Sequence, residues 1–180
     1  MENISNNLNK TKIKIRHGTN DDLNGIYDCH LKCFDKSDLW YKSIIQQSIK
    51  NSYVIEKIED STIIGVLLQG TITPCEESDK NTFVDITKSG EVFKNNNLHL
   101  ENLDGITMLC IDPKFRNKGL AKKLIEIHFN DNKDQILCLI TRKSNQAYNL
   151  YLKMGYEHIA TIKDKYFFPT EDGYFMVKTN

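Results

Sequence analysis

Hydrophobic residues recur along this chain at two spacings, every second position or every third and fourth, and the spacing changes several times. Over residues 12–16, two isoleucines alternate with charged residues, which predicts a first strand. Thr19 to Asp22 resembles a capping box, and apolar residues then follow at helical spacing as far as Phe34. The chain is therefore expected to open with a strand and a helix.

A second helix is predicted to begin at Ser37 or Asp38. Its large apolar residues are Trp40, Tyr41, Ile44, Ile45 and Ile49. Residues 53–58 and 62–73 are strand-like runs separated by a short polar turn, and they predict a hairpin.

The clearest change of spacing lies between Gly105 and Phe129. Ile106 to Ile111 is a short apolar run that predicts a largely buried strand, which Pro113 ends. Helical spacing then begins near Lys118 or Gly119. The predicted unit is strand, turn and helix.

Strands and a helix are also predicted in the rest of the chain. Further strands are predicted at 135–142, 156–162 and 173–178, with a helix at 144–154 that Gly155 ends and a connection at 163–172. Two segments lack either spacing. Residues 1–10 are predicted to be a disordered tail, and residues 74–104 an insertion or flexible loop. The prediction is an α/β fold.

The turn between the central strand and helix has the chemistry of an anion site. A glycine at a helix start allows close approach to the backbone, and the free N–H groups of the first turn attract negative charge. Five basic residues lie in or beside this turn: Lys114, Arg116, Lys118, Lys122 and Lys123. A phosphorylated ligand is the expected occupant.

Two motifs lie on either side of the strand at 135–142. The first is Arg116-x-x-Gly119-x-Ala121, and the second is the segment from Ser144 to Tyr156, which contains Ala-Tyr-Asn-Leu-Tyr-Leu-Lys-Met-Gly. Together they resemble the Gln/Arg-x-x-Gly-x-Gly/Ala and Asn-x-x-Ala-x-x-Leu-Tyr-x-x-x-Gly-Phe motifs of the GNAT acyl-CoA N-acyltransferases. The resemblance implies one GNAT domain over residues 11–180, a mixed and mostly antiparallel twisted sheet flanked by helices, with a V-shaped opening beside the central strand.

The same resemblance implies acetyl-CoA (coenzyme A) as cofactor and assigns residues to it. The implied cofactor-binding residues are Leu109, Cys110, Ile111, Arg116, Asn117, Lys118, Gly119, Leu120, Ala121, Ser144, Asn145 and Tyr151. Backbone N–H groups from Leu109 onward would bind the oxyanion, and the phenol of Tyr151 would protonate the departing thiolate. Leu109 and Tyr151 are therefore the implied catalytic residues.

The general base is not assigned. Relatives often carry a His on the strand after the central helix, whereas this chain has Cys138 and Leu139 there. His99, Glu101 or Asp104 could substitute, and a water relay or loss of the proton before binding is equally open.

The acceptor is expected to be a primary amine. The aromatic segment around Tyr166 and Phe167 resembles the acceptor loop of protein N-terminal acetyltransferases, and Phe34 lies where the family's acceptor enters. Trp40 and Tyr41 would either line this entrance or belong to the core. A protein or peptide N-terminus is the preferred acceptor. The alternative is a small polyamine-like or antibiotic-like amine, whose positive charge the acidic 74–104 insertion would attract. A catalytically silent CoA-binding domain is the remaining alternative.

Composition indicates which partners, compartment and metal sites to expect. Lys plus Arg and Asp plus Glu number 24 each, so no net charge favours nucleic acid or a membrane surface. The N-terminus does not resemble a signal peptide, so a cytoplasmic protein is expected. Its oligomeric state is expected to be a monomer or a homodimer. Cys29 and Cys33 are one helical turn apart, with His30 nearby, but no second Cys/His pair completes a four-ligand site. All five cysteines are predicted to be ordinary thiols, and no metal site is predicted.

Overall fold

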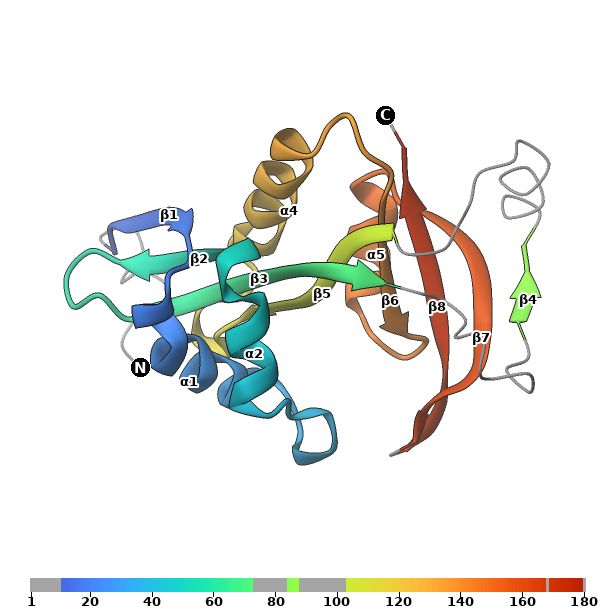
Figure 1. The fold of residues 1–180 in the computed structure, drawn as a ribbon, viewed down its shortest axis with the longest axis horizontal. Coiled ribbons are helices and arrows are strands. Elements are labelled where there is room, and N and C mark those ends of the chain that lie inside the picture. Colours follow the sequence, from blue (N-terminus) through green and yellow to red (C-terminus); the bar gives the residue numbers. More distant parts are fainter. Residues whose placement is uncertain (1–10, 73–83, 88–102, 168, 180) are drawn as a thin grey trace, which may run out of the picture. The chain divides into compact units, whose positions relative to one another are not determined.

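The computed structural model describes residues 11–72, 84–87, 103–167 and 169–179 (Figure 1). Its α-helices and strands are β1 (Ile13–His17), α1 (Leu23–Cys33), α2 (Lys42–Ser48), β2 (Ser52–Lys57), β3 (Ile63–Ile72), β4 (Val84–Ile86), β5 (Leu103–Ile111), α4 (Leu120–Asp131), β6 (Leu137–Arg142), α5 (Ala147–Lys153), β7 (Glu157–Phe167) and β8 (Thr170–Lys178). Among these residues, hydrogen bonding orders the strands β1-β2-β3-β5-β6-β8-β7-β4. The pairing is antiparallel in five neighbouring pairs and parallel between β5 and β6, which confirms the predicted α/β class and mixed sheet.

Contacts divide the chain into two compact units. The first comprises residues 1–68 and 108–124, and the second comprises residues 69–107 and 125–180. Strands β3 and β5 and helix α4 each contribute residues to both units.

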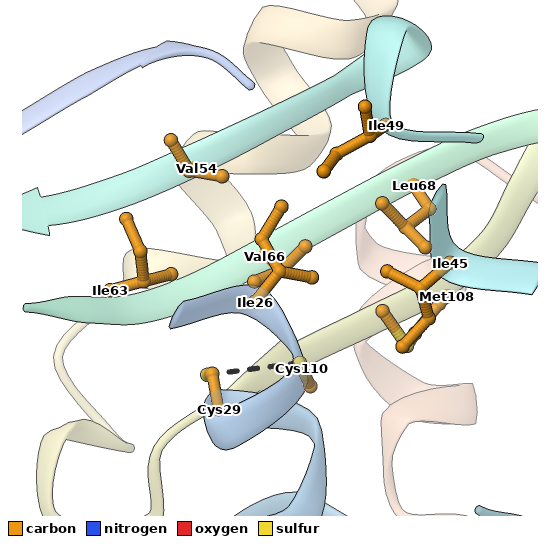
Figure 2. Packing of buried hydrophobic residues seen from close by; sticks show 10 residues of the cluster. All are labelled: Ile26, Cys29, Ile45, Ile49, Val54, Ile63, Val66, Leu68, Met108 and Cys110. Carbon is orange, nitrogen blue, oxygen red and sulfur yellow. Dashed lines mark hydrogen bonds between the residues drawn. The ribbon is translucent and has the colours of Figure 1, made fainter. Parts of the chain in front are cut away.

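The first unit has a core between its two helices and its strands. Helical spacing gives α1 one apolar face, and strand alternation gives β3 and β5 another. The buried residues of this core are Ile26, Cys29, Ile45, Ile49, Val54, Ile63, Val66, Leu68, Met108 and Cys110 (Figure 2). These contacts hold α1 against the C-terminal part of β5.

The second predicted helix begins later than its sequence pattern indicates. Tyr41 has extended backbone angles, and its carbonyl accepts the first helical hydrogen bond from the N–H of Ile44 (2.9 Å). The N–H of Trp40 donates to the side-chain Nε2 of His30 on α1 (2.9 Å) and not to a backbone carbonyl of its own helix. The prediction that Trp40 and Tyr41 lie within the helix is therefore wrong, because a tertiary hydrogen bond satisfies the backbone there instead.

The second unit is built on β6, β7 and β8, which pair antiparallel with one another through β8. On the other side of β6, β5 pairs in parallel at Gly105 with Cys138 and at Ile106 with Leu139. A Cβ atom at Gly105 would collide with the Cys138 carbonyl, so glycine is required for this close approach. The buried core of the unit contains Ile72, Cys138, Ile159, Ala160, Ile162, Phe175 and Val177.

Two sequence predictions in this unit need correction. The predicted connection at 163–172 is mostly strand, because β7 extends to Phe167 and β8 begins at Thr170. A register shift between Ile162 and Tyr166, with Asp164 in the left-handed region (φ 50°), accommodates the extra residues and hides the strand periodicity.

Within the predicted 74–104 insertion, the structure describes a short strand, β4, which pairs antiparallel with β7. The sequence did not predict this strand. The remainder of the insertion, including His99 and Glu101, lies outside the described residues, as does the predicted tail at 1–10. In the described part of the chain, no helix has the length and apolar character to span a bilayer.

The buried imidazole of His128, on α4, makes stability depend on pH. Burial lowers the pKa of His128 from 6.5 to about 4, since desolvation disfavours the charged ring. As the pH falls, the unfolded chain therefore protonates His128 near pH 6.5, whereas the folded chain does so only near pH 4. We expect the free energy of unfolding to be unaffected by His128 above pH 6.5 and to fall by about 3 kcal/mol between pH 6.5 and 4.

Urea unfolding at a series of pH values, with His128→Gln as the comparison, measures this effect. Burial also lowers the pKa of His30 and His158, so only the difference between parent and variant reports on His128. Parallel pH profiles for the two proteins would contradict the expectation.

Candidate functional site

The turn after β5 is held by local hydrogen bonds. The side chain of Asp112 accepts the N–H of Lys114 (3.0 Å), which starts a 3₁₀ turn over Pro113–Phe115. The Asp112 N–H donates to the carbonyl of Ile64 on β3 (2.9 Å). The turn therefore leaves the sheet in a fixed direction.

Two residues in this turn have left-handed backbone conformations. They are Asn117 (φ 61°) and Gly119 (φ 74°). Asparagine is among the few non-glycine residues that tolerate this region, and such residues often occur at ligand sites. The first helical bond of α4 runs from the N–H of Lys123 to the Gly119 carbonyl (3.0 Å), so Gly119 directly precedes the helix.

The space around Gly119 is open. Among the described residues, no atom lies within 4 Å of the position that a Cβ atom would take there. The following N–H groups, including those of Leu120 and Ala121, belong to the first turn of α4 and have no carbonyl partner within the helix. The predicted phosphate site thus has room, backbone donors and a helix N-terminus together.

The basic side chains of the turn differ in what they contact. The Nε of Arg116 donates to the Ile111 carbonyl (3.0 Å). The pKa of the Cys33 thiol is lowered, chiefly by the neighbouring Cys110 and Cys29 side chains and also by the Arg116 guanidinium. Nζ of Lys118 lies 5.8 Å from the centre of the Phe115 ring. Arg116 therefore both stabilises the turn, through its bond to the Ile111 carbonyl, and supplies positive charge beside it.

The residues predicted to bind the oxyanion, Leu109 to Ile111, form the end of β5. Cys110 is buried in the core of the first unit, as is Ile111, while Leu109 is half-buried. The expected donors here are backbone N–H groups, which strand geometry positions whatever the side chain.

Phe34 follows α1 directly and is half-buried against the core of the first unit. Its ring lies 4.8 Å from that of His30. Trp40 packs against the same core, whereas Tyr41 is 78% exposed. Of the three aromatic residues considered for the acceptor entrance, Tyr41 has the freest side chain.

Tyr151 lies on α5 in the second unit and is buried. Burial raises the pKa of its phenol well above the usual value of 10. The ring packs edge-on against Tyr156, with 5.8 Å between ring centres. The phenol consequently keeps its proton at neutral pH, as a general acid must.

Ser144 and Asn145 are engaged in local hydrogen bonds. The N–H and hydroxyl of Ser144 both donate to the carboxylate of Glu171, the hydroxyl at 3.0 Å. The side-chain oxygen of Asn145 accepts the N–H of Ala147 (2.9 Å) and so caps the start of α5. Both residues build the turn before α5, which leaves the Asn145 amide nitrogen as the more available donor toward a ligand.

Tyr166 and Phe167 lie at the end of β7. The guanidinium of Arg142 stacks on the Tyr166 ring at 4.2 Å and also contacts Glu171 (3.4 Å). Phe167 is 76% exposed. An ordered tyrosine and an exposed phenylalanine thus occupy the tip of the last hairpin.

Two described residues are candidates for the general base, Asp104 from the sequence prediction and His158 from the structure. Asp104 is exposed on β5. His158 on β7 is half-buried, donates from Nε2 to the Ala160 carbonyl (3.0 Å) and has a lowered pKa owing to burial. Sequence analysis missed His158, because the family pattern directs attention to a different strand.

Sequence analysis also missed a group of three cysteines. The sulfur atoms of Cys29, Cys33 and Cys110 all lie within 4.8 Å of one another. The helical spacing of the first two was visible in the sequence, but nothing local indicated the third.

Comparisons with known proteins agree with this architecture. Residues 76–158 match a family model described as the acetyltransferase (GNAT) domain. Arabidopsis thaliana NAA60 in complex with acetyl-CoA superposes with a TM-score of 0.71 at 18% identity, covering 94% of this chain and 100% of that chain. The chain has the GNAT fold.

Other GNAT structures are similar to the same extent. The ribosomal-protein-S18-alanine N-acetyltransferase of Escherichia coli has a TM-score of 0.68 at 14% identity, with 93% of each chain covered. The GNAT-like decarboxylase GphF, in complex with isobutyryl-CoA, has a TM-score of 0.67 at 13% identity, covering 92% of this chain and 98% of that chain. A search of curated protein sequences finds no match. The GNAT fold thus extends across the chain, and its reaction must be argued from its own residues.

Proposed function

We propose that this protein is an acetyl-CoA-dependent N-acetyltransferase that acts on a primary amine, with a peptide or protein N-terminus as the preferred acceptor. The acetyl group passes directly from the thioester to the amine in a ternary complex. The observation that carries this proposal is the turn before α4, where Gly119 is left-handed, its surroundings are open and a helix N-terminus follows.

The cofactor pyrophosphate binds to this turn. Backbone N–H groups of residues 117–121 donate to the phosphate oxygens, and Arg116 and Lys118 add positive charge. Several similar structures hold acetyl-CoA or CoA, among them NAA60 with acetyl-CoA and the NatC complex with CoA. Residues Ser144 and Asn145 contact the pantetheine arm.

The reaction needs three groups. The neutral amine attacks the thioester carbonyl carbon, and N–H groups near Leu109 stabilise the oxyanion. The C–S bond then breaks, and Tyr151 donates its proton to the thiolate. The amine loses its extra proton before binding or to a base, which we leave unassigned among His99, Glu101, Asp104, His158 and a water relay.

The acceptor lies near the hairpin tip formed by Tyr166 and Phe167. A Chaetomium thermophilum Naa20 complex with a bisubstrate analogue is also similar, with a TM-score of 0.68 at 21% identity, covering 92% of this chain and 86% of that chain. The similar NatC complex is bound to Gag peptide and CoA, and this likeness supports a peptide over a small amine. The small-amine alternative depends on the acidic 74–104 segment.

Substitution of Phe167 by Ala tests the acceptor assignment. Since the ring is 76% exposed, its loss should cost little stability. We expect the KM for a peptide acceptor to rise about tenfold, equivalent to about 1.4 kcal/mol, with the KM for acetyl-CoA unchanged. Steady-state kinetics with each substrate varied in turn measures both.

Ile58→Ala is the matched control, because Ile58 is also an exposed apolar residue (55%). If both variants behave as the parent with peptides while polyamines are acetylated efficiently, the acceptor is a small amine. If neither acceptor class is acetylated although acetyl-CoA binds, the protein is a CoA-binding domain without activity.

A further inference from the structure

The three-cysteine group lies inside the first unit, and only Cys110 among its members is also assigned to the cofactor, through its backbone and not its sulfur. Cys29 and Cys33 are four residues apart on α1 and share one helix face. Cys110 faces them from β5, and the Cys29 and Cys110 side chains point toward one another with their sulfur atoms 3.9 Å apart (Figure 2). Two elements separated by about eighty residues of sequence thus bring three sulfur atoms to one point.

The spacing of these atoms suits a single ion. Zinc–thiolate bonds are about 2.3 Å long, so sulfur ligands in trigonal or tetrahedral arrangement lie about 4 Å apart. The observed Sγ–Sγ separations reach at most 4.8 Å. Small rotations of the side chains are enough to close the remaining gap.

The surroundings select a soft metal over a hard one. Three sulfur donors favour zinc or cuprous ion, whereas magnesium and calcium require oxygen ligands. Three thiolates and one Zn²⁺ ion carry a net charge of −1, and the guanidinium of Arg116 at the Cys33 sulfur supplies an adjacent positive charge. Cys29 and Cys110 are buried, while Cys33 is only partly covered and provides the route of entry.

His30 does not complete the group. It lies outside the set of sulfur atoms, and its Nε2 accepts the Trp40 N–H. Among the described residues, the ligand set is therefore three cysteines, which leaves a fourth position for water on the side of Cys33.

We propose that Cys29, Cys33 and Cys110 bind one Zn²⁺ ion. The ion ties α1 to β5 at Cys110, between the two neighbouring residues assigned to the oxyanion, and lies next to the arginine that opens the phosphate turn. Metal occupancy would thereby rigidify the strand and turn on which the proposed cofactor site depends.

A disulfide is the competing use of these thiols. It would join two sulfur atoms and leave the third without a role, whereas an ion uses all three. The convergence of three thiols, two from one helix face and one from a strand, is the reason for preferring the metal.

The test uses the full-length protein with a Cys75→Ser background substitution, reduced with a phosphine and stripped with a chelator. Titration with Cd²⁺ should produce a thiolate-to-metal charge-transfer absorption that saturates at one ion per chain. Zn²⁺ should displace Cd²⁺ and raise the melting temperature. These readouts do not depend on catalytic activity.

Cys33→Ser is the decisive variant, because its partly exposed side chain makes unfolding the least expected. We expect its Zn²⁺ affinity to fall on the order of a hundredfold or more. Cys29→Ser and Cys110→Ser should behave alike if they fold. Cys138→Ala is the matched control: Cys138 is also buried and free, and its removal should leave metal binding unchanged.

Absence of the Cd²⁺ absorption from the folded parent would overturn the proposal. So would an absorption that Cys33→Ser leaves unaltered, since the ion would then be bound elsewhere. Rapid formation of an intramolecular disulfide by a chain that binds neither ion would identify the group as a redox pair instead.

Discussion

Substitution of Gly119 by Trp is expected to abolish acetyl-CoA binding. Gly119 has a φ of 74°, and in the described part of the chain no atom lies within 4 Å of the position of a Cβ atom, so an indole would occupy the open space that the pyrophosphate requires. The bulky residue would also strain a left-handed backbone. We expect a loss of affinity of at least a hundredfold, measured by isothermal titration calorimetry.

Two alanine variants separate strain from steric blockage. Gly119→Ala has room for its methyl group, and Gly155→Ala occupies another left-handed position (φ 85°) at the end of α5. Each should cost about 1 kcal/mol of stability. Only the tryptophan variant should lose the cofactor completely.

The calorimetry distinguishes two failures. If Gly119→Trp binds acetyl-CoA like the parent, the turn is not the pyrophosphate site. If the parent itself shows no binding, the proposed function is wrong. The zinc proposal would survive either result, because its readouts are metal absorption and melting temperature.

Substitution of Tyr151 by Phe is expected to lower kcat by about a hundredfold or more, with the dissociation constant of acetyl-CoA nearly unchanged. The phenol is buried and its pKa is raised, so it is in the acid form throughout the neutral range. Removing it leaves the departing thiolate without its proposed proton donor. Stopped-time assays at saturating substrate measure kcat directly.

Tyr156→Phe is the matched control. Tyr156 is a second buried tyrosine in edge contact with Tyr151, and burial raises its pKa as well. Its hydroxyl has no hydrogen-bond partner among the residues that the structure describes, so removing that hydroxyl should be neutral or stabilising and should leave kcat intact. Equal losses of kcat in the two variants would point to packing and against acid catalysis.

The pH profile gives a further check on Tyr151. Because burial raises its pKa, the phenol should not lose its proton below pH 10, and no alkaline fall in kcat should arise from it. An alkaline limb near pH 8 that disappears in Tyr151→Phe would mean that the phenol is not buried as described.

The local sequence pattern correctly predicted most of the secondary-structure elements that the structure describes. The alternation over residues 12–16 identified β1, and the capping box after it is present, with Asp22 accepting the Thr19 N–H (2.8 Å). The strand, turn and helix around Gly119 were also correctly predicted, because glycine, proline and hydrophobic spacing act over a few residues.

The predictions that failed depended on partners distant in sequence. Trp40 leaves the helix pattern because its N–H bonds to His30. The helix predicted from residue 144 begins only at Ala147, and the Ser144 N–H donates to Glu171 on β8 instead. The hairpin up to Phe167 was missed because a register shift interrupts its alternation. In each case a tertiary hydrogen bond or a bulge overrides a local preference of a few tenths of a kcal/mol.

Apart from the short strand β4, the sequence by itself determined the order of the elements, the glycine-containing turn before α4 and the helix that carries Tyr151, since each of these is encoded in neighbouring residues. Only the tertiary structure decided that Cys110 joins Cys29 and Cys33, which no local pattern relates to it. The physical reason is that periodicity specifies which face of an element is buried, whereas the fold specifies which other face it meets.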